Sequence, residues 1–194
     1  IVDITNYVML ELGQPTHAYN ANQVTEGHFV VRSARPSEVL QTLDKKEHKL
    51  DESMLLICDP VKNLGVAGIM GGESSKITAD THKLILEAAN FDPVNVRRTG
   101  IKLGIRSDAI VRFERGVDPE LIPLAMQRIN YLLSEYTGAS LASDVVDVYP
   151  NKISTPNVSL NSKKLEKYIG DFMPLSQVEK ILNGLGFNTV TSTD

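Results

Sequence analysis

The chain has 194 residues, 42% of them apolar, with four histidines and a formal net charge of −4. This length supports one main domain and a small appendage. The isoelectric point near 5.6 argues against a domain that binds nucleic acid by broad phosphate neutralisation, because such domains are usually basic on one face. Any contact with RNA must therefore be local or shared with other parts of the protein.

Several other classes of protein are excluded by what the sequence lacks. It has no run of about eighteen apolar residues for a membrane span and no basic segment followed by an apolar one for secretion, so we expect a cytoplasmic protein with no membrane partner. Cys58 lies in the apolar run 55–58, which indicates a reduced core thiol, and a single cysteine forms no disulfide within the chain. Because the chain begins at Ile1 without a methionine, we expect a fragment of a longer protein.

The first half of the chain predicts one helix followed by short strands. Asp3 is a candidate N-cap for a helix that ends before Gly13, and residues 14–20 are expected to form a loop. Apolar and β-branched residues predict a hairpin over 40–50 and strands at 28–34, 54–58, 64–70 and 83–88. Residues 65–72 carry little side-chain bulk, which allows positive φ or a close approach of another backbone or a ligand.

The next part of the chain predicts two helices and a closing strand. Each helix is expected to begin at an Asp-Pro pair, at 92–93 and at 118–119. The second keeps helical spacing to about residue 136 and ends at Gly138, and β-branched residues predict a strand at 145–149. The expected fold class is α+β, with mixed or antiparallel sheets and flanking helices.

The character of the sequence changes near residue 151, so we expect two domains, at 1–151 and 152–194. The second is a partial helix-pair or winged-helix-like module. Its expected elements are a short strand at 158–160, a helix at 162–169, a second helix that Ser176 caps and that ends before Gly186, and the first half of a hairpin at 187–190. Such modules bind nucleic acid in some proteins and pack against protein in others, and the sequence leaves both open.

Common signatures of catalytic chemistry are absent. There is no G-x-x-x-x-G-K-[ST] loop for ATP and no G-x-S-x-G turn for a nucleophilic serine. None of the histidines has a cysteine or another histidine at metal-ligand spacing, so no zinc site is expected. Basic residues alternate with acidic ones over 97–115, which favours a solvated or salt-bridged face, with a local nucleic-acid contact as the alternative.

Three groups of segments carry a more specific signal. They are NYVMLELGQPTHAY at 6–19, AGIMGG at 67–72 with LEAANFDP at 86–93, and LGIRSDA at 103–109 with RFERGVDP at 112–119. In this order and spacing they resemble the editing domain of the β subunit of bacterial phenylalanyl-tRNA synthetase, over about residues 1–150. Residues 152–194 resemble the start of the small module that follows it.

The resemblance implies hydrolysis of tyrosine that is wrongly attached to phenylalanine tRNA. Tyrosine adds one hydroxyl to phenylalanine, and an apolar synthetic pocket rejects an added hydroxyl only modestly. The resemblance implies that Glu87, which lies inside an apolar run, hydrogen-bonds to this hydroxyl. Without the resemblance, Glu87 would be interpreted as a solvent-facing glutamate on an edge strand. Ala109 is implied to leave room for the ring.

The resemblance also assigns residues near the ester bond. Ser107 stands where the family usually has threonine, so the hydroxyl is retained. Gly68 and Gly71 are implied to let backbone approach the substrate, which is compatible with a bulge or tight turn there. His17 and Asn6 are implied to line the site near the ester and the terminal adenosine. An activated ester needs no nucleophile or metal, so His17, Ser107 or the neighbouring ribose hydroxyl would direct the water.

The same resemblance implies the partners. No cofactor is expected in this segment, whereas ATP and magnesium belong to the catalytic α subunit of the full synthetase. The expected partners are phenylalanine tRNA and that α subunit, in a heterotetramer of two α and two β subunits. A non-catalytic tRNA-binding or scaffold region is the alternative, which the departure at Ser107 leaves open.

Overall fold

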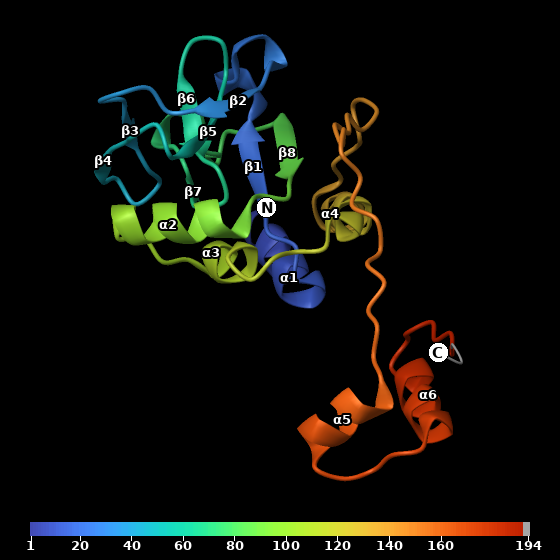
Figure 1. Ribbon diagram of the computed structural model, residues 1–194. Helices are drawn as coiled ribbons and strands as arrows, with labels where there is room; N and C mark the ends of the chain where they lie inside the picture. The colour runs from blue at the N-terminus through green and yellow to red at the C-terminus, as the bar shows by residue number, and fades with distance from the viewer. Residues whose placement is uncertain (192–194) are drawn as a thin grey trace. The chain divides into compact units, whose positions relative to one another are not determined.

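The computed structural model describes residues 1–191 and divides into two compact units, Ile1–Asp144 and Val145–Asp194. The first unit contains three antiparallel sheets with flanking helices, and the second contains two helices (Figure 1). The predicted α+β class is therefore confirmed. Within residues 1–191, no helix is both long and apolar enough to cross a membrane.

The N-terminal helix, α1 (Val2–Leu12), ends as predicted at Gly13, which adopts φ +79° and donates its N–H to the Met9 carbonyl. The left-handed conformation favours glycine at this position. Asp3 was wrongly predicted as the N-cap, because Ile1 occupies that position and no side chain caps it. Asp3 instead lies in the first turn, where a carboxylate interacts favourably with the helix dipole.

The segment expected to be a loop contains a strand, β1 (Thr16–Asn20), so that prediction was wrong. β1 pairs antiparallel with β8 (Leu84–Ala88), the strand predicted at 83–88 (Figure 1). The register places His17 opposite Glu87. A short polar sequence carries little strand propensity of its own, and cross-strand pairing overrides it here. Because side chains alternate along a strand, His17, Tyr19 and Glu87 share one face of this two-stranded sheet.

The largest sheet has the strand order β2 (Val30–Ser33), β5 (Leu55–Cys58), β6 (Asn63–Val66) and β7 (Met70–Gly71), with antiparallel neighbours. β2 and β5 confirm the strands predicted at 28–34 and 54–58. The single strand expected over 64–70 was wrong, because Gly68, at φ +69°, lies in a turn that separates β6 from β7. β3 (Val39–Gln41) and β4 (Glu47–Lys49) confirm the predicted hairpin.

Helices complete the first unit. Asp92 caps α2 (Pro93–Leu103), as predicted, by accepting a hydrogen bond from the Asn95 N–H at 2.7 Å. The helix expected after residue 118 forms as the 3-10 turn η4 (Pro119–Leu121) and α4 (Ile122–Thr137), and it ends at Gly138. One further helix, α3 (Asp108–Phe113), was not predicted. Three further 3-10 turns are η1 (Ala21–Gln23), η2 (Thr25–Gly27) and η3 (Glu73–Ser75).

The β1–β8 pair separates two hydrophobic cores. The larger core contains Tyr19 and residues of β5, β6, α2 and α3, with Ile85 packed against it. The smaller lies between α1 and α4, with Leu86 of β8 packed against it. Since Ile85 and Leu86 are neighbours in one strand, the two faces of β8 belong to different cores. Glu87 therefore shares the Ile85 face, which borders the larger core.

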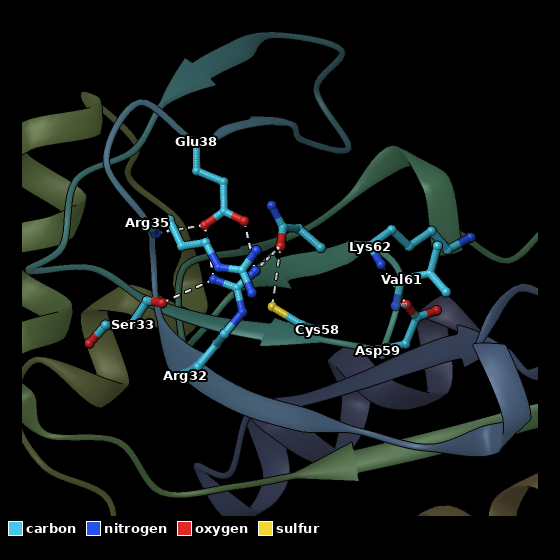
Figure 2. A network of polar contacts seen from close by, with 9 residues as sticks. Arg32, Ser33, Arg35, Glu38, Cys58, Asp59, Val61 and Lys62 are labelled. Atoms are coloured by element: carbon cyan, nitrogen blue, oxygen red, sulfur yellow. Dashed lines mark hydrogen bonds and ion pairs between the residues drawn. The ribbon is translucent and has the colours of Figure 1, made fainter.

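A polar network joins the strands of the large sheet (Figure 2). The guanidinium of Arg32 donates to both carboxylate oxygens of Glu38, at 2.7 and 2.9 Å, and to Asn63 Oδ1 at 3.0 Å. The Arg32 interaction lowers the pKa of Glu38 to about 2. Cys58 contacts the same Asn63 oxygen at 3.3 Å and is buried and free, with its thiol pKa raised by desolvation. It is the predicted core thiol.

In the second unit, the predicted helices form and the predicted strands do not. α5 (Ser162–Ile169) is capped by Asn161, and α6 (Leu175–Gly184) follows. Ser176 was wrongly predicted as the cap of α6, because Pro174 occupies that position. The described chain forms no strand at 145–149, 158–160 or 187–190. Those three predictions were wrong, because β-branched or aromatic content without a paired neighbour does not make a strand.

Candidate functional site

A cavity lies between the β1–β8 pair, the β6–β7 turn and α3. Its volume of about 90 Å³ is several times the minimum of roughly 10–15 Å³ that one water needs. Ile57, Phe91, Ala109 and Phe113 supply apolar wall, and residues 65–71 supply much of the rest. The side chains with titratable groups are His17, Tyr19 and Glu87. A mostly apolar cavity with a few convergent polar groups is typical of a small-molecule site.

Glu87 is the acidic group of the cavity. It is half-buried, lies opposite His17 in the strand register, and accepts a hydrogen bond at Oε2 from the Tyr19 hydroxyl. Desolvation raises the pKa of this carboxyl, and the Tyr19 hydrogen bond acts in the opposite direction. The side chain faces the cavity, as a carboxylate placed to receive a donor would.

Tyr19 is a residue of the site that the sequence analysis missed. It is 1% exposed, and its ring packs edge-on against His17 at a centroid distance of 4.5 Å and against Phe29 at 5.1 Å. Desolvation and the nearby Glu87 carboxylate raise the pKa of its hydroxyl far above the usual range, so the phenol stays protonated and donates. The two-residue spacing from His17 would have placed Tyr19 on the same face if residues 16–20 had been recognised as a strand.

His17 has an unused nitrogen. Its Nε2 is buried and has no hydrogen-bond partner among the described residues. Desolvation lowers the pKa of the imidazole to about 4, so the ring is neutral at pH 7. Thr16, its neighbour in the cavity wall, also has a buried hydroxyl oxygen without a partner in the described chain. Buried polar atoms are usually satisfied, and exceptions beside a cavity point to a ligand or water.

Gly68 and Gly71 line the cavity, and different neighbours exclude a side chain at each of them. A Cβ at Gly71 would lie 2.5 Å from Cε1 and 2.6 Å from Nε2 of His17, so the imidazole occupies the space that a side chain would need. A Cβ at Gly68 would lie 2.9 Å from Phe91 and 3.0 Å from Val96, in a backbone conformation that already favours glycine. Close packing within the protein accounts for both positions, and a contact with substrate stays a prediction.

Three further residues were expected at the site. Ala109, on α3, lines the cavity. Ser107 is the N-cap of α3, where its hydroxyl accepts from the Ile110 N–H and donates to the Ile69 carbonyl, both at 3.3 Å. It ties α3 to the β6–β7 turn and is not among the lining residues. Asn6 is exposed on α1, also outside the lining. The cavity brings together His17, Gly68, Gly71, Glu87 and Ala109.

Charged groups elsewhere on the first unit are partly paired. Lys102 contacts Asp51 at 3.0 Å, and Arg112 contacts Asp108 at 3.5 Å. Two of the basic residues at 97–115, Lys102 and Arg112, thus form salt bridges. In residues 1–191, no group of three or more histidine, cysteine, aspartate and glutamate side chains could hold a metal ion.

Comparison with known proteins gives the family. Residues 1–138 match the family model of the B3/4 domain. The phenylalanine–tRNA ligase beta subunit of Clostridium tetani is 39% identical over 194 residues, which cover 100% of this chain and 24% of the relative. The beta subunits of Dehalococcoides mccartyi and Syntrophus aciditrophicus are 42% and 41% identical over 187 residues, or 96% of this chain and 23% of each relative.

The chain spans about a quarter of the length of these curated relatives. The similarity covers both units, since it extends across nearly the whole chain, whereas the family match is confined to the first. Homology to phenylalanine–tRNA ligase beta subunits confirms the resemblance that the sequence motifs carry. The chain belongs to the B3/4 domain family.

Proposed function

We propose that this chain is part of a phenylalanine–tRNA ligase β subunit and that its cavity hydrolyses tyrosine wrongly attached to phenylalanine tRNA. The observation that carries the proposal is the position of Glu87. This carboxylate faces a cavity with aromatic and aliphatic walls and already accepts a hydrogen bond from a phenol, that of Tyr19. A substrate phenol presents the same chemical group.

Selectivity follows from hydrogen bonding in a desolvated site. Phenylalanine would fill the apolar part of the cavity but would leave a lone pair of Glu87 without a donor, at a cost of about 1–3 kcal/mol. That penalty corresponds to a preference for tyrosine of roughly 5- to 150-fold. Ala109 contributes by leaving space for the ring, since it lines the cavity with a single methyl group.

Hydrolysis needs a positioned water more than a strong base, because an aminoacyl ester is already activated. His17 has a neutral imidazole with a free Nε2, which can hydrogen-bond to that water. With a pKa of about 4, the ring is a weak base at pH 7, so we assign it the role of orienting the water. The neighbouring hydroxyl of the terminal ribose is the second candidate. The Ser107 hydroxyl is already engaged by backbone groups.

The proposal extends to the assembly. The partners are phenylalanine tRNA and a catalytic α subunit, in a cytoplasmic heterotetramer of two α and two β subunits. Residues 1–151 form the editing domain and 152–194 begin the module that follows. ATP and magnesium act in the α subunit. No cluster within residues 1–191 fits a magnesium ion, and no step of the proposed hydrolysis uses one.

Deacylation of tyrosine-charged phenylalanine tRNA by the full-length ligase tests the proposal. Glu87→Ala removes the phenol acceptor and Ala109→Trp fills the cavity, so each is expected to slow deacylation at least about tenfold. Glu52→Ala and Ala139→Trp are matched controls at exposed positions outside the cavity. Unchanged deacylation in both Glu87→Ala and Ala109→Trp would favour a non-catalytic tRNA-binding or scaffold role.

A further inference from the structure

The hydrogen bond between Tyr19 and Glu87 uses only half of the carboxylate. The Tyr19 hydroxyl donates to Oε2, and Oε1 has no hydrogen-bond partner among residues 1–191. Both side chains line the cavity. An ionised carboxylate has about four lone-pair positions and can accept from two donors at once. One oxygen is thus occupied from within the protein, and the other is available to a ligand.

Tyr19 is well suited to fix a carboxylate in one orientation. Its ring is buried between His17 and Phe29, and the register places it on the same face of the β1–β8 pair as Glu87. A glutamate side chain has several rotatable bonds, so a rigid donor at Oε2 removes freedom that a ligand would otherwise have to restrict on binding.

We propose that Tyr19 is a positioning residue for specificity: its hydroxyl holds Glu87 so that Oε1 receives the phenol of the bound tyrosine. The inference rests on the proposed function and deepens it. Tyr19 does not compete with the substrate, because the two phenols use different oxygens of the same carboxylate. It prepares the acceptor before the substrate arrives.

The hydrogen bond from Tyr19 also favours the ionised form of Glu87. A substrate phenol donates to an ionised carboxylate, whereas a neutral carboxylic acid carries a proton of its own at the oxygen that must accept. Desolvation raises the pKa of Glu87, and the Tyr19 hydrogen bond opposes that rise. The other titratable groups near the pair are His17 on β1, which is neutral, and Cys58 on β5, whose thiol pKa is raised.

The test uses the 194-residue chain with Tyr19→Phe, which removes one oxygen and keeps the ring. Tyr7→Phe is the matched control, because Tyr7 donates to Glu11 at 3.3 Å on the exposed surface of α1. The carboxyl carbon of Glu87 is followed by NMR as pH is varied. Its titration midpoint is expected to rise in Tyr19→Phe and to stay unchanged in Tyr7→Phe. An unchanged midpoint in Tyr19→Phe would overturn the inference.

A second arm measures binding of free L-tyrosine and L-phenylalanine to the same proteins. The wild-type chain is expected to prefer tyrosine, and Tyr19→Phe to lose about tenfold of that preference with its phenylalanine affinity unchanged. A preference that is equal or greater in Tyr19→Phe would mean that Tyr19 competes with the ligand, which overturns the inference. A wild-type chain without any preference contradicts the proposed function, and the NMR midpoint then still decides whether Tyr19 controls Glu87.

Discussion

The first unit contains two pairs of a tyrosine and a glutamate in opposite environments. Tyr19 and Glu87 face the cavity on the β1–β8 pair, whereas Tyr7 and Glu11 lie one helical turn apart on the outside of α1. In the outer pair, Arg128 of α4 donates to both oxygens of Glu11, at 2.8 and 3.0 Å. Within residues 1–191, no lysine or arginine pairs with Glu87 of the inner pair.

The pKa values of the two glutamates are therefore shifted in opposite directions. The Arg128 hydrogen bond lowers the pKa of Glu11, and desolvation raises the pKa of Glu87. A phenol–carboxylate hydrogen bond in water replaces an equally good bond to water and adds little, whereas inside the protein a missing donor leaves a desolvated charge. The same pair of residue types is therefore a surface detail on α1 and a recognition element in the cavity.

The largest effect on stability and deacylation is expected from a substitution that crowds the cavity wall at His17. Gly71→Ala places a methyl group within 2.6 Å of the His17 ring and must displace it. We expect a loss of about 1–3 kcal/mol in the free energy of unfolding, together with a loss of tyrosine-tRNA deacylation on the order of 100-fold. Urea unfolding and deacylation of the charged tRNA measure the two effects.

Gly184→Ala is the control for that substitution, because nothing lies within 4 Å of the Cβ it would add at the end of α6. It is expected to leave deacylation unchanged. Normal deacylation by Gly71→Ala would contradict the assignment of His17 to the site.

The direct form of the comparison is the removal of each phenol oxygen. Tyr19→Phe leaves one oxygen of a desolvated carboxylate without its donor, and we expect it to cost about 1–2 kcal/mol in the free energy of unfolding at pH 7. Tyr7→Phe acts on an exposed pair and is expected to cause no resolvable change. Equal losses for the two variants, measured by urea unfolding under identical conditions, would show that burial does not distinguish the pairs.

The smallest expected effect is in the pH dependence of stability, and it has opposite signs for the two glutamates. The raised pKa of Glu87 means that its contribution is fully present below the unfolded value of 4.5 and is lost as pH rises through the folded pKa. The lowered pKa of Glu11 means that its contribution is present above 4.5 and is lost as pH falls through the folded pKa.

Substitution by glutamine removes each titration while keeping the side-chain shape. Relative to the wild-type chain, Glu87→Gln should gain stability as pH rises above 4.5. Glu11→Gln should lose stability as pH rises toward 4.5 from below, and its deficit should stay constant above 4.5. Urea unfolding at a series of pH values measures both differences. Parallel curves for the two variants would contradict the opposite pKa shifts.

Helices were predictable where their signals are local. Asp92 followed by Pro93 defines the start of α2, and α5 occupies the residues predicted for it. These signals depend on capping and on φ preferences, which act within a few residues. β1 was missed because its strand conformation depends on pairing with β8, more than sixty residues later in the chain. The strand predicted at 145–149 failed for the converse reason, since it has no partner in the described chain.

The residues of the candidate site likewise differ in whether local sequence predicts them. Glu87, Ala109 and His17 were named from sequence motifs, and the fold places all three at one cavity. Tyr19 was not named, although it stands only two residues after His17, because a loop prediction gives no information about which side chains share a face. Ser107 was named for its hydroxyl, but capping of α3 uses that hydroxyl, and capping depends on a helix that the sequence analysis did not identify.

Glu87 is proposed to accept a hydrogen bond from the substrate phenol at Oε1, the oxygen that Tyr19 leaves free. A crystal structure of the chain soaked separately with L-tyrosine and with L-phenylalanine tests it most directly. We expect tyrosine in the cavity with its phenol oxygen within about 3 Å of Glu87 Oε1, the Tyr19 contact to Oε2 retained, and much lower occupancy for phenylalanine. Equal occupancy of the two amino acids, or tyrosine bound away from Glu87, would contradict it.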